Sequence, residues 1–367
     1  MMSGGCDTIV SILFILLTSF TITPSAFSVP PMSTSYPRLL HPGGFSLPPM
    51  MEDLLSIATV TSSNINENKI LQKDLLLVRP PDMESLWEWY AYTKRQTDSD
   101  PSWGRIWPTA LSLARFVLQS LNSGQNYEMN QEIIDIMMGL EDQEQELVEQ
   151  AIGALQRSSH VIEVGCGLGV NGLSFAIAAK SMSIKRTVTF LDREAYALHC
   201  VMASASINNL ATAPISNDAR HTDDSAPLIT VRSSIDDWTS ADKNICYKDL
   251  CLDSLDIQNK QTLILASDIL YEPSSMDSLT TKLRNLLEPK EGGYVLITDP
   301  EKERTSGCRI KFVKSVQDMG GQVVILPLPQ PNSSGKALNK PILVESDVDI
   351  DGNLAKTVLI VVHFNGE

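Results

Sequence analysis

The sequence predicts an α/β fold, in which an open sheet of seven strands, six parallel and an antiparallel seventh, carries helices on both faces. Residues 161–164 form a short apolar run that leads through a glycine-rich turn into a helix, as expected of a parallel strand covered on both sides. Further apolar runs alternate with helical segments along the chain. The last two runs, at 321–326 and 357–364, have no helix between them, so they can pair as a hairpin that reverses the final strand.

Each element is predicted from its own pattern. The strands are expected at residues 161–164, 187–191, 228–232, 262–267, 293–298, 321–326 and 357–364. Helices are expected at residues 84–96, 111–118, 171–180, 194–208, 275–287 and 306–319, from the spacing of their apolar residues. Pro108 fits the start of the second of these helices, where its missing N–H costs nothing.

The turn after the first strand predicts a ligand site. Gly165, Gly167 and Gly169 remove three Cβ atoms where the chain must turn sharply and let a ligand approach the backbone. The following helix points the N–H groups of its first turn back at that ligand. The second strand ends in Asp192, whose carboxylate is placed to accept hydrogen bonds from two ribose hydroxyls.

Two ligands fit this turn. Gly167-x-Gly169-x-x-Gly172, with Asp192 at the end of the next strand, satisfies the dinucleotide pattern of NAD-binding proteins. Glu163, a charged residue inside an apolar strand, favours a different ligand, because burying a carboxylate without a partner is expensive and suggests a nearby positive charge. A ligand with a cationic amino-acid end has a use for Glu163, whereas NAD has none.

The pattern Glu-x-Gly-x-Gly-x-Gly at 163–169, followed by Asp192, resembles motif I of the class I, seven-β-strand methyltransferases. The resemblance implies a Rossmann-like sheet and S-adenosyl-L-methionine as the cofactor. It also implies that the cofactor is bound by the residues of the motif, which are Glu163, Gly165, Cys166, Gly167, Gly169 and Asp192.

Three further elements are similar to methyltransferase family 16, which includes many protein-lysine methyltransferases. Trp-Pro-x-Ala at 107–110 supplies Trp107, which the resemblance places in the cofactor pocket. After the third strand, the pair Asp237 and Trp238 would flank the adenine, and a stacked indole is a sound physical use of an exposed Trp. The third element is Asp-x-x-Tyr at 268–271, directly after the fourth strand.

The Asp-x-x-Tyr element carries the implied mechanism. Ligands in open α/β sheets bind beyond the carboxyl ends of the strands, so Ser267, Asp268 and Tyr271 belong at the same rim as Asp192, with Ser267 at the cofactor. Asp268 would accept a hydrogen bond from a substrate ammonium and orient the amine. Tyr271 would form a wall of the lysine channel and stabilise cationic states through its ring. The resemblance thus implies a protein-lysine N-methyltransferase with a protein substrate.

Three other functions remain open on the sequence. A small-molecule methyltransferase could use the same fold, because substrate recognition lies in loops. A non-catalytic adapter could retain the fold, although the intact Glu163, Asp192 and Asp268 speak against it. An NAD oxidoreductase is the remaining alternative.

Composition excludes some partners. The chain has 367 residues, a formal net charge of −15 and no basic run, which argues against binding of nucleic acid or of anionic membranes. Its hydrophobic content of 43% suffices for a substantial core. The six cysteines contain no Cys-x-x-Cys pair and have no histidine at zinc-ligand spacing, so we expect no metal site and reduced thiols.

The N-terminal residues resemble a targeting sequence. Residues 9–17 are apolar but shorter than the ~20 residues that span a bilayer, as in a signal peptide, which we place at 1–26. Residues 25–30 resemble the cleavage junction of bipartite plastid presequences in algae with secondary plastids, and 27–50 is interpreted as the transit segment. We expect a plastid protein, with secretion or the endomembrane lumen as the alternative, and no stable membrane insertion of the mature chain.

The remaining chain divides into two parts. Residues 51–84 are interpreted as a linker or irregular extension, and residues 85–367 as the methyltransferase domain. Polar or acidic insertions are expected near 122–158, 211–227, 239–260 and 328–355. We expect helix 84–96 to pack its aromatic rings on the domain and the first insertion to form an exposed helix.

Overall fold

A computed structural model gives the fold. It describes residues 56–60, 75–80, 83–92, 101–126, 131–212, 227–239, 262–287, 292–328 and 356–366, all within a unit that spans Leu39–Glu367. The predicted signal peptide, the predicted transit segment and most of the insertions expected at 211–227, 239–260 and 328–355 lie outside the described residues. In the segments that the structure describes, no helix has both the length and the apolar character needed to cross a membrane.

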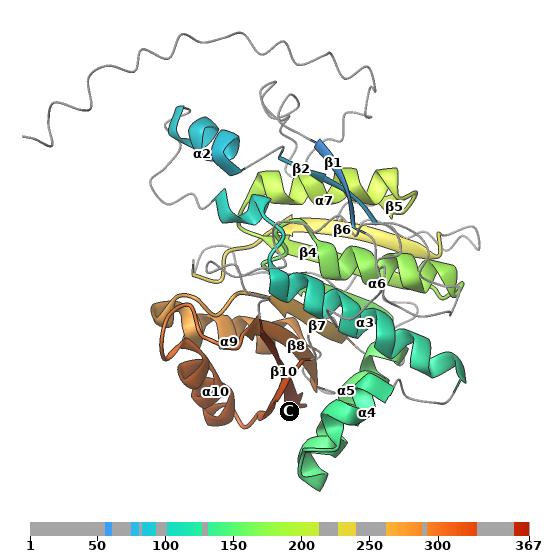
Figure 1. The fold of residues 1–367 in the computed structure, drawn as a ribbon, viewed down its shortest axis with the longest axis vertical. Helices are drawn as coiled ribbons and strands as arrows, with labels where there is room; N and C mark the ends of the chain where they lie inside the picture. The colour runs from blue at the N-terminus through green and yellow to red at the C-terminus, as the bar shows by residue number, and fades with distance from the viewer. Residues whose placement is uncertain are drawn as a thin grey trace, which may run out of the picture. The chain divides into compact units, whose positions relative to one another are not determined.

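An eight-stranded sheet forms the centre of this unit (Figure 1). Its strands are β3 (His160–Val164), β4 (Arg186–Asp192), β5 (Ala211–Thr212), β6 (Ile229–Ile235), β7 (Thr262–Ser267), β8 (Gly292–Pro300), β9 (Gln322–Pro327) and β10 (Thr357–Asn365). The order across the sheet is β5-β6-β4-β3-β7-β8-β10-β9. Neighbouring strands pair in parallel except at β10, which is antiparallel to both β8 and β9.

All seven predicted strands are present, and the last is antiparallel as expected. The predicted total of seven is wrong by one, because Ala211–Thr212 adds a short strand beside β6 where the sequence indicated a polar loop. Two residues are too few to show a periodic pattern, so this edge strand forms only through its pairing with β6.

The sheet order places the glycine-rich turn at the centre of the fold. β3 lies between β4 and β7, and all five of its residues are buried. The chain moves outward in one direction through β4 and β6 and in the other through β7 and β8. The carboxyl end of β3 is therefore the point where the strand order reverses, and such points are where open α/β sheets bind their ligands.

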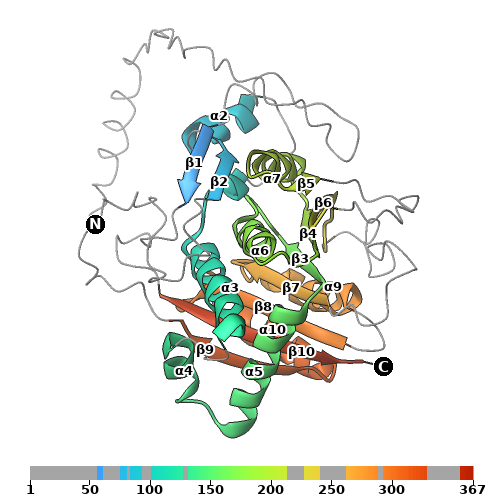
Figure 2. The same cartoon turned by 90° about the vertical axis from the view of Figure 1, so that its right-hand side faces the viewer.

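Helices cover both faces of the sheet, as predicted (Figure 2). One face carries α3 (Pro108–Asn126), α5 (Asp142–Arg157), α6 (Val170–Ser181) and α7 (Ala195–Ile207), which share one hydrophobic cluster with the sheet. The other face carries α9 (Met276–Leu286) and α10 (Cys308–Asp318), which share a second cluster with it. The short helices α4 (Gln131–Met137) and η4 (Pro273–Ser275) lie between these elements in the chain.

The first acidic insertion is only partly exposed. Its acidic helix, α5, turns six apolar residues into the core: Leu147, Val148, Ala151, Ile152, Ala154 and Leu155. The expectation of an exposed helix therefore holds for the acidic face and is wrong for the other. The acidic residues around 141–149 dominate the composition of this segment, but apolar residues recur among and after them at helical spacing. These apolar residues determine which face of the helix packs on the core.

The region before α3 is more ordered than expected. β1 (Ser56–Val60) and β2 (Leu75–Arg79) form an antiparallel pair within the stretch interpreted as a linker. The backbone N–H of Val78 donates to Ser204 Oγ of α7 over 2.8 Å, which fixes β2 to the domain. In α2 (Met83–Tyr92), Tyr90 is buried as expected, whereas Trp87 is 55% exposed.

Candidate active site

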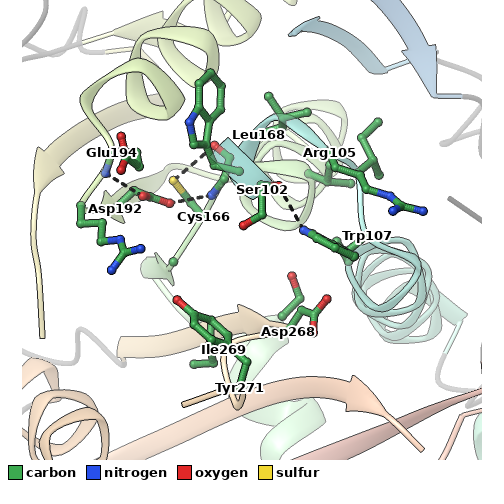
Figure 3. A pocket seen from close by; sticks show the side chains of 18 of the residues that line it. Ser102, Arg105, Trp107, Cys166, Leu168, Asp192, Glu194, Asp268, Ile269 and Tyr271 are labelled. Carbon is green, nitrogen blue, oxygen red and sulfur yellow. Dashed lines mark hydrogen bonds between the residues drawn. The ribbon is translucent and has the colours of Figure 1, made fainter. Parts of the chain in front are cut away.

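A pocket of about 720 Å³, including its open side, lies at the carboxyl ends of the parallel strands (Figure 3). The segments that follow β3, β4, β6 and β7 line it, together with the 3₁₀ helix η2 (Pro101–Gly104) and the start of α3.

The glycine turn brings backbone to the pocket wall. Gly165 and Gly167 have φ angles of +60° and +50°, which side chains with a Cβ rarely adopt. A Cβ on Gly165 would lie 2.9 Å from Ile269 and 3.3 Å from the ring of Trp238. Both the φ angle and the close packing of Ile269 and Trp238 therefore require glycine at position 165. Cys166, between them, also lines the pocket, and burial raises the pKa of its thiol well above the usual value.

Glu163 does not line the pocket. It is 1% exposed, and its carboxylate accepts hydrogen bonds from Asn171 Nδ2 at 2.9 Å and from the backbone N–H of Gly172 at 2.7 Å. Within the described residues its hydrogen-bond partners are amide groups, and the positive charge expected from a ligand stays a prediction. Gly169 likewise lies behind the pocket wall, as the N-cap of α6. Burial raises the pKa of Glu163 to about 7.

Asp192 lies at the end of β4 and lines the pocket. Its Oδ2 accepts a hydrogen bond from the backbone N–H of Gly167 at 2.8 Å, and its Oδ1 accepts one from the backbone N–H of Glu194 at 2.9 Å. Each carboxylate oxygen can accept a second hydrogen bond. The two backbone contacts hold the carboxylate against the glycine turn, in position to bind a polar ligand.

Trp238 lines the pocket, whereas Asp237 does not. Asp237 accepts hydrogen bonds from the backbone and side chain of Thr239, at 2.9 and 2.6 Å. The buried acid of this segment is Asp236, which forms an ion pair of 2.6 Å with Lys282 of α9. Asp236 therefore fixes the strand end from which Trp238 projects, a role that the sequence did not reveal.

The segment before α3 closes one side of the pocket. Trp103 and Trp107 line it, and Trp107 Nε1 donates to the carbonyl of Ser102 over 3.2 Å. Trp103 Nε1 donates to the Tyr90 hydroxyl at 2.9 Å, and that hydroxyl donates to Glu194 Oε2 at 3.0 Å. This chain of hydrogen bonds links α2 to the segment that holds Asp192.

Asp268 is held in a strained conformation. Its φ angle is +59°, in the left-handed region that residues with a Cβ rarely adopt. It is 8% exposed and lines the pocket. Burial raises the pKa of its carboxyl to about 6, although Arg304, its ion-pair partner, acts in the opposite direction.

Arg304 is the main residue that the sequence reasoning missed. It lies in the loop between β8 and α10, forms an ion pair with Asp268, and stacks on Trp107 with 3.7 Å between the guanidinium carbon and the ring centroid. Thr305 donates to the carbonyl of Tyr271 over 2.7 Å and so fixes the loop beside the pocket. The rule that sites lie after strand ends, applied to β8, would have indicated this loop.

The structure thus brings nine of the twelve predicted site residues to one pocket: Trp107, Gly165, Cys166, Gly167, Asp192, Trp238, Ser267, Asp268 and Tyr271. It places three outside the pocket lining: Glu163, Gly169 and Asp237. Besides Arg304, the sequence reasoning missed Arg105 and Trp103, which lie close to Trp107 in the chain before α3. Among the described residues, no group of three or more His, Cys, Asp or Glu side chains could hold a metal ion.

Comparison with known proteins gives remote similarities. No family model and no curated protein matches the sequence. A solved S-adenosylmethionine-dependent methyltransferase from Methanosarcina mazei is 12% identical, with a TM-score of 0.35, over 59% of this chain and 96% of that one. Geranyl diphosphate methyltransferase in complex with S-adenosylmethionine is 12% identical, with a TM-score of 0.32, over 60% and 84%. The branched-chain polyamine synthase of Thermus thermophilus is 11% identical, with a TM-score of 0.36, over 60% and 55%.

These TM-scores are too low to support a functional assignment, and the function below is inferred from the residues of this chain. The narrower resemblance to methyltransferase family 16 finds no support in the comparisons and stays a prediction.

Proposed function

We propose that the protein is a methyltransferase that uses S-adenosyl-L-methionine. The observation that carries the proposal is that Asp192, Trp238 and Asp268 line one pocket beside a glycine turn. Asp192 would hold the ribose and Trp238 would stack on the adenine. The cofactor supplies an activated methyl group on a sulfonium.

The environment of α6 favours this cofactor over NAD. A dinucleotide places its pyrophosphate at the N-terminus of the helix after the glycine turn, where free N–H groups accept an anion. Here the N–H of Gly172, in the first turn of α6, already donates to the buried carboxyl group of Glu163. A pyrophosphate at this helix end would find the N–H of Gly172 already used, and it would be repelled by Glu163 once that residue is ionised. A cationic sulfonium ligand would not be repelled.

For the acceptor, we propose an amine, with the side chain of a protein lysine as the favoured source. Methyl transfer needs a deprotonated nucleophile held in line with the methyl group, and much of its rate comes from that positioning. An acceptor that binds as an ammonium must first lose its proton to solvent, and burial in the pocket would ease that loss. Asp268 would accept a hydrogen bond from the nitrogen and orient it, and Tyr271, on the same side of the pocket, would form a wall (Figure 3). A small-molecule amine is the alternative acceptor, because substrate recognition lies in loops whose sequences do not distinguish a protein substrate from a small molecule.

Two measurements test the proposal. Calorimetric titration of the purified protein with S-adenosylhomocysteine and with NAD should give binding of the first and none of the second. Binding of NAD alone would overturn the assignment, and binding of neither would favour a non-catalytic adapter.

Incubation with radiolabelled S-adenosylmethionine and a cell extract should then label a protein band, and hydrolysis of that band should yield methylated lysine. Label in metabolites alone would favour the small-molecule alternative. Asp268→Ala should abolish labelling while S-adenosylhomocysteine still binds, and full labelling by that variant would remove Asp268 from the mechanism.

A further inference from the structure

Asp268 and Trp107 both line the pocket, and both contact the guanidinium of Arg304. The Arg304 guanidinium carbon lies 3.7 Å from the centroid of the Trp107 ring and the guanidinium forms an ion pair with the Asp268 carboxylate. The side chain of Asp268 is 4% exposed and that of Arg304 is 35% exposed. A buried carboxylate beside an indole face is a binding site for a cation.

We infer that Arg304 occupies the subsite that takes the cationic amine of the acceptor, and that it must leave before the acceptor binds. Arg304 would then be a specificity-determining residue, since only a ligand that replaces its positive charge can enter at little cost. This inference rests on the proposed function for the identity of the reaction, but not for the existence of the cation subsite.

The loop that carries Arg304 is anchored independently of it. Glu303 accepts hydrogen bonds from the backbone N–H of Gly307 at 2.6 Å and of Arg309 at 3.1 Å, and Thr305 donates to the Tyr271 carbonyl. The Arg304 side chain can therefore rotate into solvent while the backbone of the loop keeps its place. Its partial exposure means that it leaves without crossing the core.

The charge balance determines which ligand can displace it. Removal of Arg304 alone would leave the buried Asp268 carboxylate without its partner, and an unpaired buried charge is strongly destabilising. An incoming ammonium restores the pair and can also use the Trp107 face. A neutral or anionic acceptor restores neither, so the exchange selects cations.

A second arginine suggests the main alternative. The Arg105 guanidinium carbon lies 4.8 Å from the centroid of the same Trp107 ring, so Arg105 and Arg304 together could bind an anionic acceptor. The ion pair favours displacement of Arg304 by a cation over binding of an anion, because Asp268 already neutralises the charge of Arg304. When Arg304 is removed, the first possibility predicts tighter binding of a cation and the second predicts loss of anion binding.

The test uses a small cation and a small anion of the same shape. Binding of n-butylammonium and of butyrate is measured by saturation-transfer NMR at pH 8, with and without S-adenosylhomocysteine. The proteins are wild type, Arg304→Ala, Arg304→Gln and a control, Lys302→Ala, which removes an equal charge from an exposed position of the same loop. Thermal melts establish that each variant is folded.

If Arg304 fills the subsite about nine-tenths of the time, its removal should tighten butylammonium binding about tenfold. Arg304→Gln should behave like Arg304→Ala, and Lys302→Ala like wild type. Unchanged or weaker butylammonium binding in both Arg304 variants would overturn the inference, as would butyrate binding that is lost with Arg304. Failure of S-adenosylhomocysteine to bind, with butylammonium still tightened, would refute the proposed function and leave the cation subsite standing.

Discussion

The backbone N–H of Gly172 donates a hydrogen bond to Oε2 of Glu163 over 2.7 Å, so a carboxyl group that is 1% exposed lies at the N-terminus of α6. The contact ties the central strand to the helix that follows it and fixes the turn between them. It also explains the glycine at position 172 of α6, because a Cβ there would lie 2.8 Å from the same oxygen.

Glu163→Gln should remove a decrease in the free energy of unfolding that the wild type undergoes as the pH rises. Burial raises the pKa of Glu163 from 4.5 to about 7, so its ionisation disfavours the folded state. The contribution of its neutral form is present below pH 4.5 and is lost as the pH rises through 7, by up to about 3 kcal/mol. Glutamine can accept from the N–H of Gly172 and, once the Asn171 amide turns over, donate to Asn171 Oδ1, which has no hydrogen-bond partner among the described residues.

Urea unfolding at pH 5 and pH 8 measures this effect. The difference in unfolding free energy between variant and wild type should favour the variant at pH 8 and shrink at pH 5. An equal difference at both values would mean that Glu163 does not titrate in this range.

Gly172→Ala should destabilise the fold, while a second helical glycine should tolerate the same change. The new Cβ at Gly172 would lie 2.6 Å from Phe190 and 2.8 Å from Glu163, both buried, and we expect a loss of about 1–3 kcal/mol. At Gly153 the Cβ would meet only the flexible end of Arg157, and Ala should stabilise α5 by about 0.5–1 kcal/mol. Chemical unfolding of both variants measures the two changes in unfolding free energy. Equal changes at Gly172 and Gly153 would contradict the prediction.

Tyr90→Phe should weaken cofactor binding, although Tyr90 itself does not line the pocket. The Tyr90 hydroxyl links Trp103 to Glu194, whose backbone N–H holds Asp192. Loss of the link should weaken binding of S-adenosylhomocysteine by about 5- to 10-fold, equivalent to one net hydrogen bond. Calorimetric titration measures it.

Tyr294→Phe is the matched control for this experiment. It removes a hydroxyl that donates to Gln150 Oε1 over 2.9 Å, away from the pocket lining. Its cofactor affinity should equal that of wild type. Equal weakening by both substitutions would show that the effect of Tyr90 is on stability alone.

Methyl transfer should fall on the acid side of about pH 6. Burial raises the pKa of Asp268 from 3.8 to about 6, Arg304 and Arg105 lower it, and Asp299 raises it. The ionised form needed to hold an ammonium is present above that pH, so kcat/KM should drop about tenfold per unit below it. Arg304→Gln removes a cation beside Asp268 and should shift the acid-side fall of kcat/KM to higher pH. If that fall stays at the same pH in the variant, the ionisation of Asp268 does not cause it.

Much of the fold could be predicted because the signals are local. Each of the seven main strands is a short apolar run, and the carboxyl-end rule brought Asp192, Trp238 and Asp268 to one rim although they are distant in sequence. The hairpin of β1 and β2 could not be predicted, because its strands are defined by their pairing and by the contact of β2 with α7. Sequence pattern carries little information on such pairings.

The positions of Glu163 and Asp237 outside the pocket lining have a common physical cause. Glu163 and Asp237 were assigned by position in a motif, but the direction of a side chain depends on the neighbours that pack beside it. Asn171 and Gly172 already satisfy Glu163, while Asp236 and Lys282 take the buried position in place of Asp237. Arg304 reaches Asp268 across a loop, and no spacing in the sequence indicates that contact.

The most direct test of the account is the affinity for S-adenosylhomocysteine of wild type, Asp192→Ala and the exposed control Asp318→Ala, measured by calorimetry with melting temperatures recorded alongside. Loss of two hydrogen bonds to a charged group should weaken binding by at least about 100-fold in Asp192→Ala, with no change in the control. Asp192→Asn, which keeps the shape of the side chain, should also bind more weakly than wild type. Wild-type affinity in both Asp192 variants would contradict the placement of the cofactor in this pocket.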